Sequence, residues 1–250
     1  MVEGLDVFKR YFKGCEDQYI LIGGTACDIL FEQSDMTFRA TKDLDIVLVV
    51  EELTSEFGEK IWKFIRDGGY RNKYTSNGIP QFYRFDKPEN STFPKMIELF
   101  SRKNFNFANS SNITAIHIDD EISSLSAILL NDAYYQILLE GRIIEDGLSV
   151  LRPEYIILFK AKAFLDLSER KVLGEHVDSK NIKKHKRDIL RITSELMLNA
   201  IDDLPNEVLT DISLFLKRLD IEPFDKNLLD VYGLTNEQIV SLLRNLYFHE

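Results

Sequence analysis

The sequence is poor in three features that mark specialised classes of protein. It has two cysteines, Cys15 and Cys27, in 250 residues; this excludes a disulfide framework, and neither lies at metal-ligand spacing. Long hydrophobic runs are missing: stretches such as Ile46 to Val50 fall far below the roughly 20 residues of a membrane-spanning helix. Met1 to Lys13 contains two acids and no long apolar stretch, which predicts neither a signal peptide nor a membrane anchor. We therefore expect a soluble, cytoplasmic protein.

Positive charge is also scarce. Lys and Arg total 31 against 41 Asp and Glu, which gives a formal net charge of -10. A chain this acidic is not expected to coat nucleic acid with its whole surface, because neutralising phosphates requires an excess of Lys and Arg. A local basic patch and a carboxylate site that holds a cation both remain compatible with this charge. Hydrophobic residues make up 44% and charged residues 29%, values that exclude disorder and collagen-like structure.

Hydrophobic periodicity divides the chain into two parts that meet near Pro153. Helical spacing and short β-branched runs alternate before it, which predicts a mixed α/β (α+β) domain over residues 1–150. Only helical spacing recurs after it, which predicts a helical domain over residues 151–250. The expected helices are Leu5–Phe12, Thr25–Phe31, Phe57–Phe64, Glu154–Glu169, Lys180–Met197, Asn206–Leu219 and Asn236–Tyr247. The expected strands are Tyr19–Ile22, Ile46–Val50, Gln81–Phe85, Met96–Phe100 and Ile113–Ile118, and Asn104–Asn112 is expected to be a loop.

Two glycines stand where an expected strand meets an expected helix. Gly23 and Gly24 follow the apolar run that begins at Tyr19, and Thr25 opens the helix after them. Glycine lets another group approach the backbone closely, and the first turn of a helix presents free N–H groups and a partial positive charge. This combination suits a triphosphate, with the Thr25 hydroxyl as a further donor. Gly-Gly turns without phosphate are common, so the pair alone is a weak indication.

Three acids follow in strand-like surroundings. Asp43 and Asp45 are two positions apart at the head of a strand, so both carboxylates face one side while Leu44 faces the core. Such like charges repel each other unless a divalent cation lies between them, and Mg²⁺ is typically held by one or two carboxylates plus phosphates. Glu98 lies within the apolar strand Met96–Phe100, where a carboxylate is costly unless paired or metal-bound. The alternatives are a solvated DxD pair at a strand end and an outward-facing Glu98.

The Gly-Gly pair, the DxD pair and the later acidic strand residue together resemble the nucleotidyltransferase superfamily that includes DNA polymerase beta. Asp43 follows Gly24 by 19 positions, and the string R-A-T-K-D-L-D at residues 39–45 is similar to that of the abortive-infection type of nucleotidyltransferase toxins. The resemblance covers Tyr19 to Phe100, with Glu98 where an Asp is commoner. It implies a nucleotidyltransferase-type mixed sheet with helices, followed by a helical C-terminal domain. The implied roles are catalysis and binding of Mg²⁺ (or Mn²⁺) for Asp43, Asp45 and Glu98, and nucleotide binding for Gly23, Gly24, Thr25, Arg39 and Thr41.

The resemblance extends into the helical half. The toxins carry a Lys on one helix, matched here by Lys162 (or Lys160), and Lys-x-x-x-Asp on the next, matched by Lys184 and Asp188. This implies nucleotide binding for Lys162 and catalytic roles for Lys184 and Asp188. The last two also share a helix face, as a plain surface ion pair would. The segment Lys180–Arg191 has six basic residues against one acid, which indicates either a solvated helix face or a patch that steers a polyanion.

These features support one principal hypothesis and two alternatives. The principal hypothesis is a Mg²⁺-dependent nucleotidyltransferase that transfers NMP from an NTP to an acceptor hydroxyl on an RNA end or a protein. The resemblance implies a toxin of a toxin–antitoxin or phage-defence system, with an antitoxin protein as partner and no membrane partner. One alternative is a catalytically silent nucleotidyltransferase fold that binds or regulates. The other is a nucleotidyltransferase that acts on a small, antibiotic-like molecule.

Overall fold

The structure is a computed structural model that describes residues 2–39, 41–76, 82–102, 114–116, 124, 125, 128, 129 and 131–249. Contacts within the chain divide it into two compact units. The sheet unit comprises Met1–Asp119 and Arg142–Arg152, and the helical unit comprises Asp120–Gly141 and Pro153–Glu250. The protein is therefore mixed α/β, as the sequence predicts.

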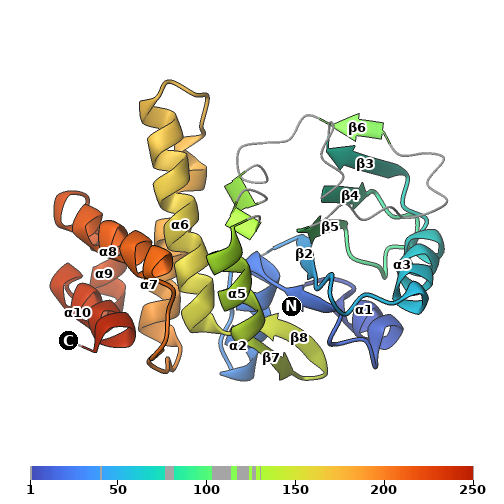
Figure 1. The fold of residues 1–250 in the computed structure, drawn as a ribbon, viewed down its shortest axis with the longest axis horizontal. Helices are drawn as coiled ribbons and strands as arrows, with labels where there is room; N and C mark the ends of the chain where they lie inside the picture. The colour runs from blue at the N-terminus through green and yellow to red at the C-terminus, as the bar shows by residue number, and fades with distance from the viewer. Residues whose placement is uncertain are drawn as a thin grey trace. The chain divides into compact units, whose positions relative to one another are not determined.

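One eight-stranded mixed sheet forms the centre of the sheet unit (Figure 1). Its strands are β1 (Tyr19–Leu21), β2 (Asp43–Leu48), β3 (Asn72–Ser76), β4 (Phe82–Asp86), β5 (Met96–Ser101), β6 (Thr114–Ile116), β7 (Arg142–Glu145) and β8 (Leu148–Leu151). They are ordered β6-β3-β4-β5-β2-β1-β8-β7. The unit also contains helices α1 (Leu5–Phe12), α2 (Gly23–Gln33) and α3 (Ser55–Gly68). Because β2 and β5 pair in parallel, their first residues lie at the same edge of the sheet.

Aromatic side chains form the core that joins α1, β1 and α3. The fully buried ring of Phe12 lies 5.4 Å from that of Phe57 and 5.5 Å from that of Phe64. Phe8 meets Tyr19 of β1 edge to face at 5.2 Å. Aromatic pairs of this kind add about 0.5–1.5 kcal/mol each beyond the burial of their surface. This packing holds β1 firmly, and with β1 the turn that follows it.

The helical unit contains α5 (Asp132–Glu140), α6 (Pro153–Val172), α7 (Ser179–Glu195), α8 (Asn206–Ile221), α9 (Lys226–Tyr232) and α10 (Asn236–Phe248). Helix α6 begins with Pro153, at the first helical position, where proline is favoured. It packs against α7 and α8, and the rings of Phe164 and Phe215 meet at 5.4 Å. The carbonyl of the buried Glu154 accepts a hydrogen bond from the Tyr247 hydroxyl at 2.7 Å, which attaches α10 to the start of α6.

The expected helices and strands are confirmed apart from their ends, and the expected loop 104–112 lies outside the described residues. The sequence patterns did not predict β3, α5, β7, β8 or α9. Two of these strands change the division of the chain, for which we expected a single boundary near residue 150. Strand β8 pairs with β1 through Val150 and Leu21, so the β7–β8 hairpin belongs to the sheet unit. Helix α5, which precedes the hairpin, contacts α6 and α8 and belongs to the helical unit.

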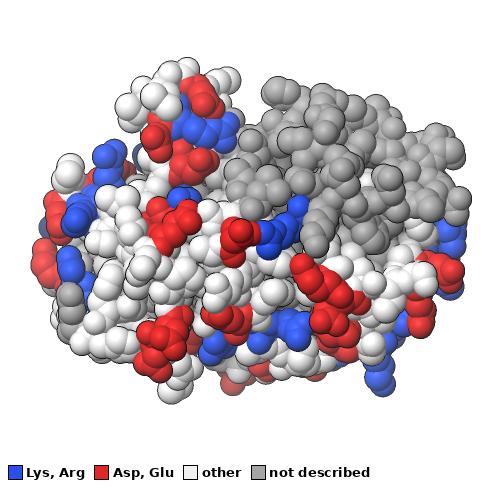
Figure 2. Space-filling view, viewed as in Figure 1, with Lys and Arg blue, Asp and Glu red and all other residues white. Residues whose placement is uncertain are grey.

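None of the helices in the described part of the chain is long and apolar enough to span a membrane. On the face drawn in Figure 2, the Lys and Arg side chains are interspersed with Asp and Glu. The net charge of -10 therefore does not form one acidic field on that face.

Candidate active site

The turn from β1 into α2 requires a glycine at position 23. Gly23 has a φ of 63°, in the left-handed region that favours glycine, and a Cβ there would collide with the Asp45 carboxylate. Helix α2 follows Ile22, whose side chain provides no cap and whose N–H donates to the Asp45 carbonyl at 3.1 Å. The first-turn N–H groups of a helix have no acceptor within the helix. In this protein, those of α2 begin directly beside Asp45.

Gly24 allows a second close approach, by the segment that connects α2 to β2. A Cβ on Gly24 would lie 2.8 Å from the Thr41 hydroxyl oxygen and 3.6 Å from a guanidinium nitrogen of Arg39. The Arg39 guanidinium carbon also lies over the Phe38 ring, 5.3 Å from its centroid. The two glycines thus gather a cation and a hydroxyl at the positive end of a helix, a combination that suits an anion.

We expect Gly23→Ala to lower both the melting temperature and the affinity for NTP. A left-handed conformation costs a non-glycine residue about 1–2 kcal/mol, and the added methyl group would also displace Asp45. Gly58→Ala is the matched control, because Gly58 lies inside α3 with no atom within 4 Å of the added Cβ. That substitution should stabilise the protein by up to about 1 kcal/mol. Thermal denaturation of both variants is the measurement, and a Gly23→Ala protein as stable as Gly58→Ala would contradict the prediction.

The three predicted acids meet at the edge where β2 and β5 begin. Asp45 and Glu98 are register partners in the parallel pair, and the two aspartates are half-buried on either side of the fully buried Leu44. Glu98 is 7% exposed, so it does not face outward into solvent. The hydroxyl of the buried Thr25, expected to contact a phosphate, instead donates to the Asp43 carbonyl at 2.6 Å. It attaches α2 to β2, and the Thr25 N–H remains the predicted phosphate donor.

Glu98 has a cationic partner that the sequence did not suggest. Arg84, its register partner on β4, donates to Glu98 Oε1 from Nε at 2.7 Å, and its Nη2 lies 2.6 Å from the same oxygen. Burial raises the pKa of Glu98 above the usual glutamate range, and the charge of Asp43 acts in the same direction. The Arg84 ion pair and a hydrogen bond with Asp45 act against this rise in pKa. Glu98 is thus held in place and electrostatically linked to both aspartates.

The carboxylates suit a cation, although they form a small group of ligands. Carboxylate oxygens are what Mg²⁺ prefers, and it commonly uses one or two of them together with phosphates and water. Within the described ranges, no group of three or more His, Cys, Asp and Glu side chains is arranged to hold a metal. Asp43 and Asp45 are therefore the residues that fit Mg²⁺ or Mn²⁺. The ligand role of Glu98 remains a prediction.

The site residues expected in the helical unit lie in ion pairs of that unit. Asp188 pairs with Lys160 at 2.7 Å, and their side chains are 1% and 7% exposed. Lys162 pairs with Asp211 at 2.8 Å, and the Tyr134 hydroxyl donates to the same carboxylate oxygen at 3.0 Å. Lys160, the alternative match to the family pattern, is thus the lysine that holds Asp188. The nucleotide-binding role of Lys162 and the catalytic role of Asp188 remain predictions.

The basic residues of α7 fall into two groups. Lys186 and Arg191 pair with Glu222 and Glu195, each at 3.0 Å. Four others stand at positions i, i+3, i+4 and i+7 and so share one helix face, which we call the α7 basic face: Lys180, Lys183, Lys184 and Arg187. The first, second and fourth are exposed, and Lys184 is half-buried.

In comparisons with known proteins, no family model matches the chain and no curated protein matches it. The structure brings together the residues predicted in the sheet unit, namely Gly23, Gly24, Thr25, Arg39, Thr41, Asp43, Asp45 and Glu98. Sequence reasoning missed Arg84, although a basic residue between aromatic residues in Gln81–Phe85 was a usable signal.

Proposed function

We propose that the protein is a Mg²⁺-dependent nucleotidyltransferase that transfers NMP from an NTP to an acceptor hydroxyl. One observation carries the proposal: Gly23, at the start of α2, lies against the Asp45 carboxylate, whose register partner on β5 is Glu98. A backbone suited to phosphate and carboxylates suited to a cation are therefore immediate neighbours, as an NTP and its metal require. The mixed sheet, with acids on adjacent parallel strands, is compatible with the nucleotidyltransferase-type fold that the resemblance implies.

In the proposed reaction, the first-turn N–H groups of α2 and the Arg39 guanidinium hold the β- and γ-phosphates. A Mg²⁺ ion bound by Asp43 and Asp45 would supply neutralisation of the charge on the phosphates. The acceptor oxygen forms a bond to the α-phosphorus, the bond from that phosphorus to the α–β bridging oxygen breaks, and pyrophosphate leaves. Glu98 takes the proton of the acceptor hydroxyl. The rate enhancement in this scheme comes from positioning and charge neutralisation.

RNA is the acceptor that the charges favour. The α7 basic face presents three exposed cations and a half-buried fourth in a chain of net charge -10. Cations spaced along a helix bind the phosphates of nucleic acid and attract it from a distance. A role as a toxin or phage-defence factor with an antitoxin partner belongs to the proposal through the resemblance alone.

The function is tested by incubating the protein and Mg²⁺ with total RNA and, separately, each of the four α-labelled NTPs. We expect label to appear on RNA together with pyrophosphate release. Binding of NTP in calorimetry without transfer to any acceptor would favour the catalytically silent module. Label on a cationic small molecule but not on RNA would favour the antibiotic-type enzyme. Failure of all four NTPs to bind in the presence of Mg²⁺ would overturn the proposal.

The proton acceptor predicts a particular dependence of kcat on pH. Since the pKa of Glu98 is raised, the carboxyl is protonated at pH values at which an ordinary glutamate is ionised. The activity should therefore fall as the pH falls through that raised pKa. Loss of a general base lowers rates by about 10²–10⁴-fold, so Glu98→Gln should show this loss with no acidic limb left in its profile.

Glu98→Asp is the companion variant, since it retains an acid at this position. It should keep the acidic limb at a reduced rate. Circular dichroism over the same pH range separates loss of activity from unfolding. An acidic limb that persists in a folded Glu98→Gln protein would assign the proton to another group.

A further inference from the structure

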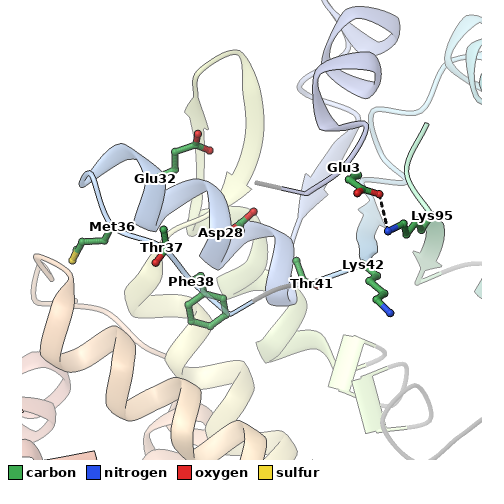
Figure 3. Close-up of a pocket in the computed structure, with 9 residues that line it drawn as sticks. All are labelled: Glu3, Asp28, Glu32, Met36, Thr37, Phe38, Thr41, Lys42 and Lys95. Atoms are coloured by element: carbon green, nitrogen blue, oxygen red, sulfur yellow. Dashed lines mark ion pairs between the residues drawn. The ribbon is translucent and has the colours of Figure 1, made fainter. Parts of the chain in front are cut away.

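A pocket of about 430 Å³ adjoins the glycine turn in the sheet unit (Figure 3). Asp28 and Glu32 project into this region from α2, and Thr37, Phe38, Thr41 and Lys42 come from the segment between α2 and β2. Lys95 and Glu3, which form an ion pair at 2.8 Å, lie at the end opposite Met36. Binding pockets for small molecules have volumes of about 300–1,000 Å³, so this space can take a ligand of nucleoside size.

Two residues connect this pocket to the proposed phosphate site. Thr41 lines the pocket, and its hydroxyl oxygen lies 2.8 Å from where a Cβ of Gly24 would stand. Arg39 lies over Phe38, another lining residue, while one of its guanidinium nitrogens is 3.6 Å from the same Cβ position. A ligand with its phosphates on the glycine turn can therefore extend into the pocket without crossing the backbone.

The charges of the pocket differ between its two sides. Asp28 is 8% exposed and stands one helical turn after Gly24, so it lies deep on the α2 side. A carboxylate accepts hydrogen bonds and cannot donate them when ionised. Lys42 is exposed at the start of β2, next to Asp43, and supplies a cation on the other side. A nucleotide has the same asymmetry, because it is anionic at its phosphates and rich in donors at its ribose and base.

We propose that this pocket holds the nucleoside of the NTP and that Asp28 determines its specificity by accepting two hydrogen bonds from adjacent donors. This inference rests on the proposed function. Two parts of a nucleotide present such paired donors: the N1–H and 2-amino edge of guanine, and the 2′,3′-diol of ribose. Adenine offers one donor beside an acceptor, which an ionised carboxylate repels. A site built to bond a substrate donor rejects analogues that lack it, since its own buried group is left unpaired.

The test is calorimetric titration of the protein in Mg²⁺, without acceptor, with GTP, ITP, ATP and dGTP. ITP lacks the 2-amino group and dGTP lacks the 2′-hydroxyl, so they separate the base edge from the ribose. We expect GTP to bind more tightly than at least one of these two. Asp28→Asn should weaken GTP binding about 10- to 100-fold, as expected for hydrogen bonds to a charged group, and should remove that preference.

Asp35→Asn is the matched control. Asp35 is an exposed acid that follows α2 outside the pocket, and its φ of 56° is one that asparagine tolerates. It should bind all four nucleotides like the wild type. Lys42→Gln, at an exposed position where misfolding is not expected, should weaken all four equally, because it removes a cation that would serve the phosphates they share.

The outcomes separate this inference from the proposed function. If the wild type binds no NTP, both fail. If the wild type binds and transfers NMP while Asp28→Asn retains the wild-type affinities and preference, only the assignment of the pocket fails. Selective weakening of ATP by Lys42→Gln, with GTP unchanged, would also contradict it, because Lys42 would then contact the base.

Discussion

Replacing both Asp43 and Asp45 by asparagine is expected to reduce nucleotidyl transfer by at least about 10³-fold. The physical reason is that the variant loses the negative charge that holds Mg²⁺ between the protein and the phosphates, while the amide side chains keep nearly the same shape. Removing one preorganised electrostatic contact from an active site typically costs about 10²–10³ in rate, and here two are removed. The melting temperature should stay the same or rise, since the repulsion between the two half-buried carboxylates is relieved.

Label transfer from the preferred α-labelled NTP and thermal denaturation, performed on the same preparations, provide the two readouts. Glu52→Gln serves as control, because Glu52 is an exposed acid just past the other end of β2 and its loss should change neither readout. If the double variant unfolds at a much lower temperature, the pair has a structural role. If it remains folded and active, the catalytic assignment is wrong.

The second large effect concerns stability, and it is expected at the ion pair of Lys160 and Asp188. Both side chains are buried, with exposures of 7% and 1%. Asp188→Ala would leave the ammonium of Lys160 without its counter-charge inside the helical unit. Breaking a buried pair by removing one partner costs about 3–5 kcal/mol, so urea denaturation should show a strong loss of stability.

The double variant Lys160→Met, Asp188→Leu decides how that loss is interpreted. Replacing both charges by apolar side chains removes the unpaired ion, and such replacements are often neutral or stabilising. We therefore expect it to recover much of the stability lost in Asp188→Ala. Arg71→Ala is the control for a surface pair: Arg71 and Glu89 are 68% and 64% exposed, so only a small change is expected.

This pair of variants also tests the predicted catalytic role of Asp188. A stable double variant that still transfers NMP would mean that Asp188 serves the packing of α6 against α7 alone. A stable double variant without transfer would support the role that the resemblance implies. A stable and active Asp188→Ala protein would contradict both the structural and the catalytic assignment.

Much of the sheet unit was predictable because its patterns are local. Leu5 to Phe12 has helical apolar spacing and forms α1 over those residues. The convergence of Asp43 and Asp45 follows from the two-residue period of a strand, and β2 has that period. Elements without a clear period were missed: Asn72–Ser76 forms β3 although it contains Asn, Lys and Ser, residues that are not typical of strands. Its pairing with β4 and β6 comes from the rest of the sheet.

The partners of the predicted residues could not be read from the sequence. Arg84 and Glu98 are 14 positions apart and meet only because β4 and β5 pair in an antiparallel register. Lys162 and Asp211 are 49 positions apart and meet only where α6 packs on α8. Spacing along one helix favoured a pair of Lys184 with Asp188, whereas the tertiary structure pairs Asp188 with the more distant Lys160.

By itself, the sequence determined the mixed α/β class, the Gly-Gly turn and the placement of three acids at strand starts and interiors, because these follow from periods of two and 3.6 residues and from the backbone freedom of glycine. Only the tertiary structure decided that Gly23 lies against Asp45, that Glu98 is paired with Arg84, and that a pocket adjoins Thr41. Those contacts depend on strand order and register, which arise from the packing of segments far apart in the chain.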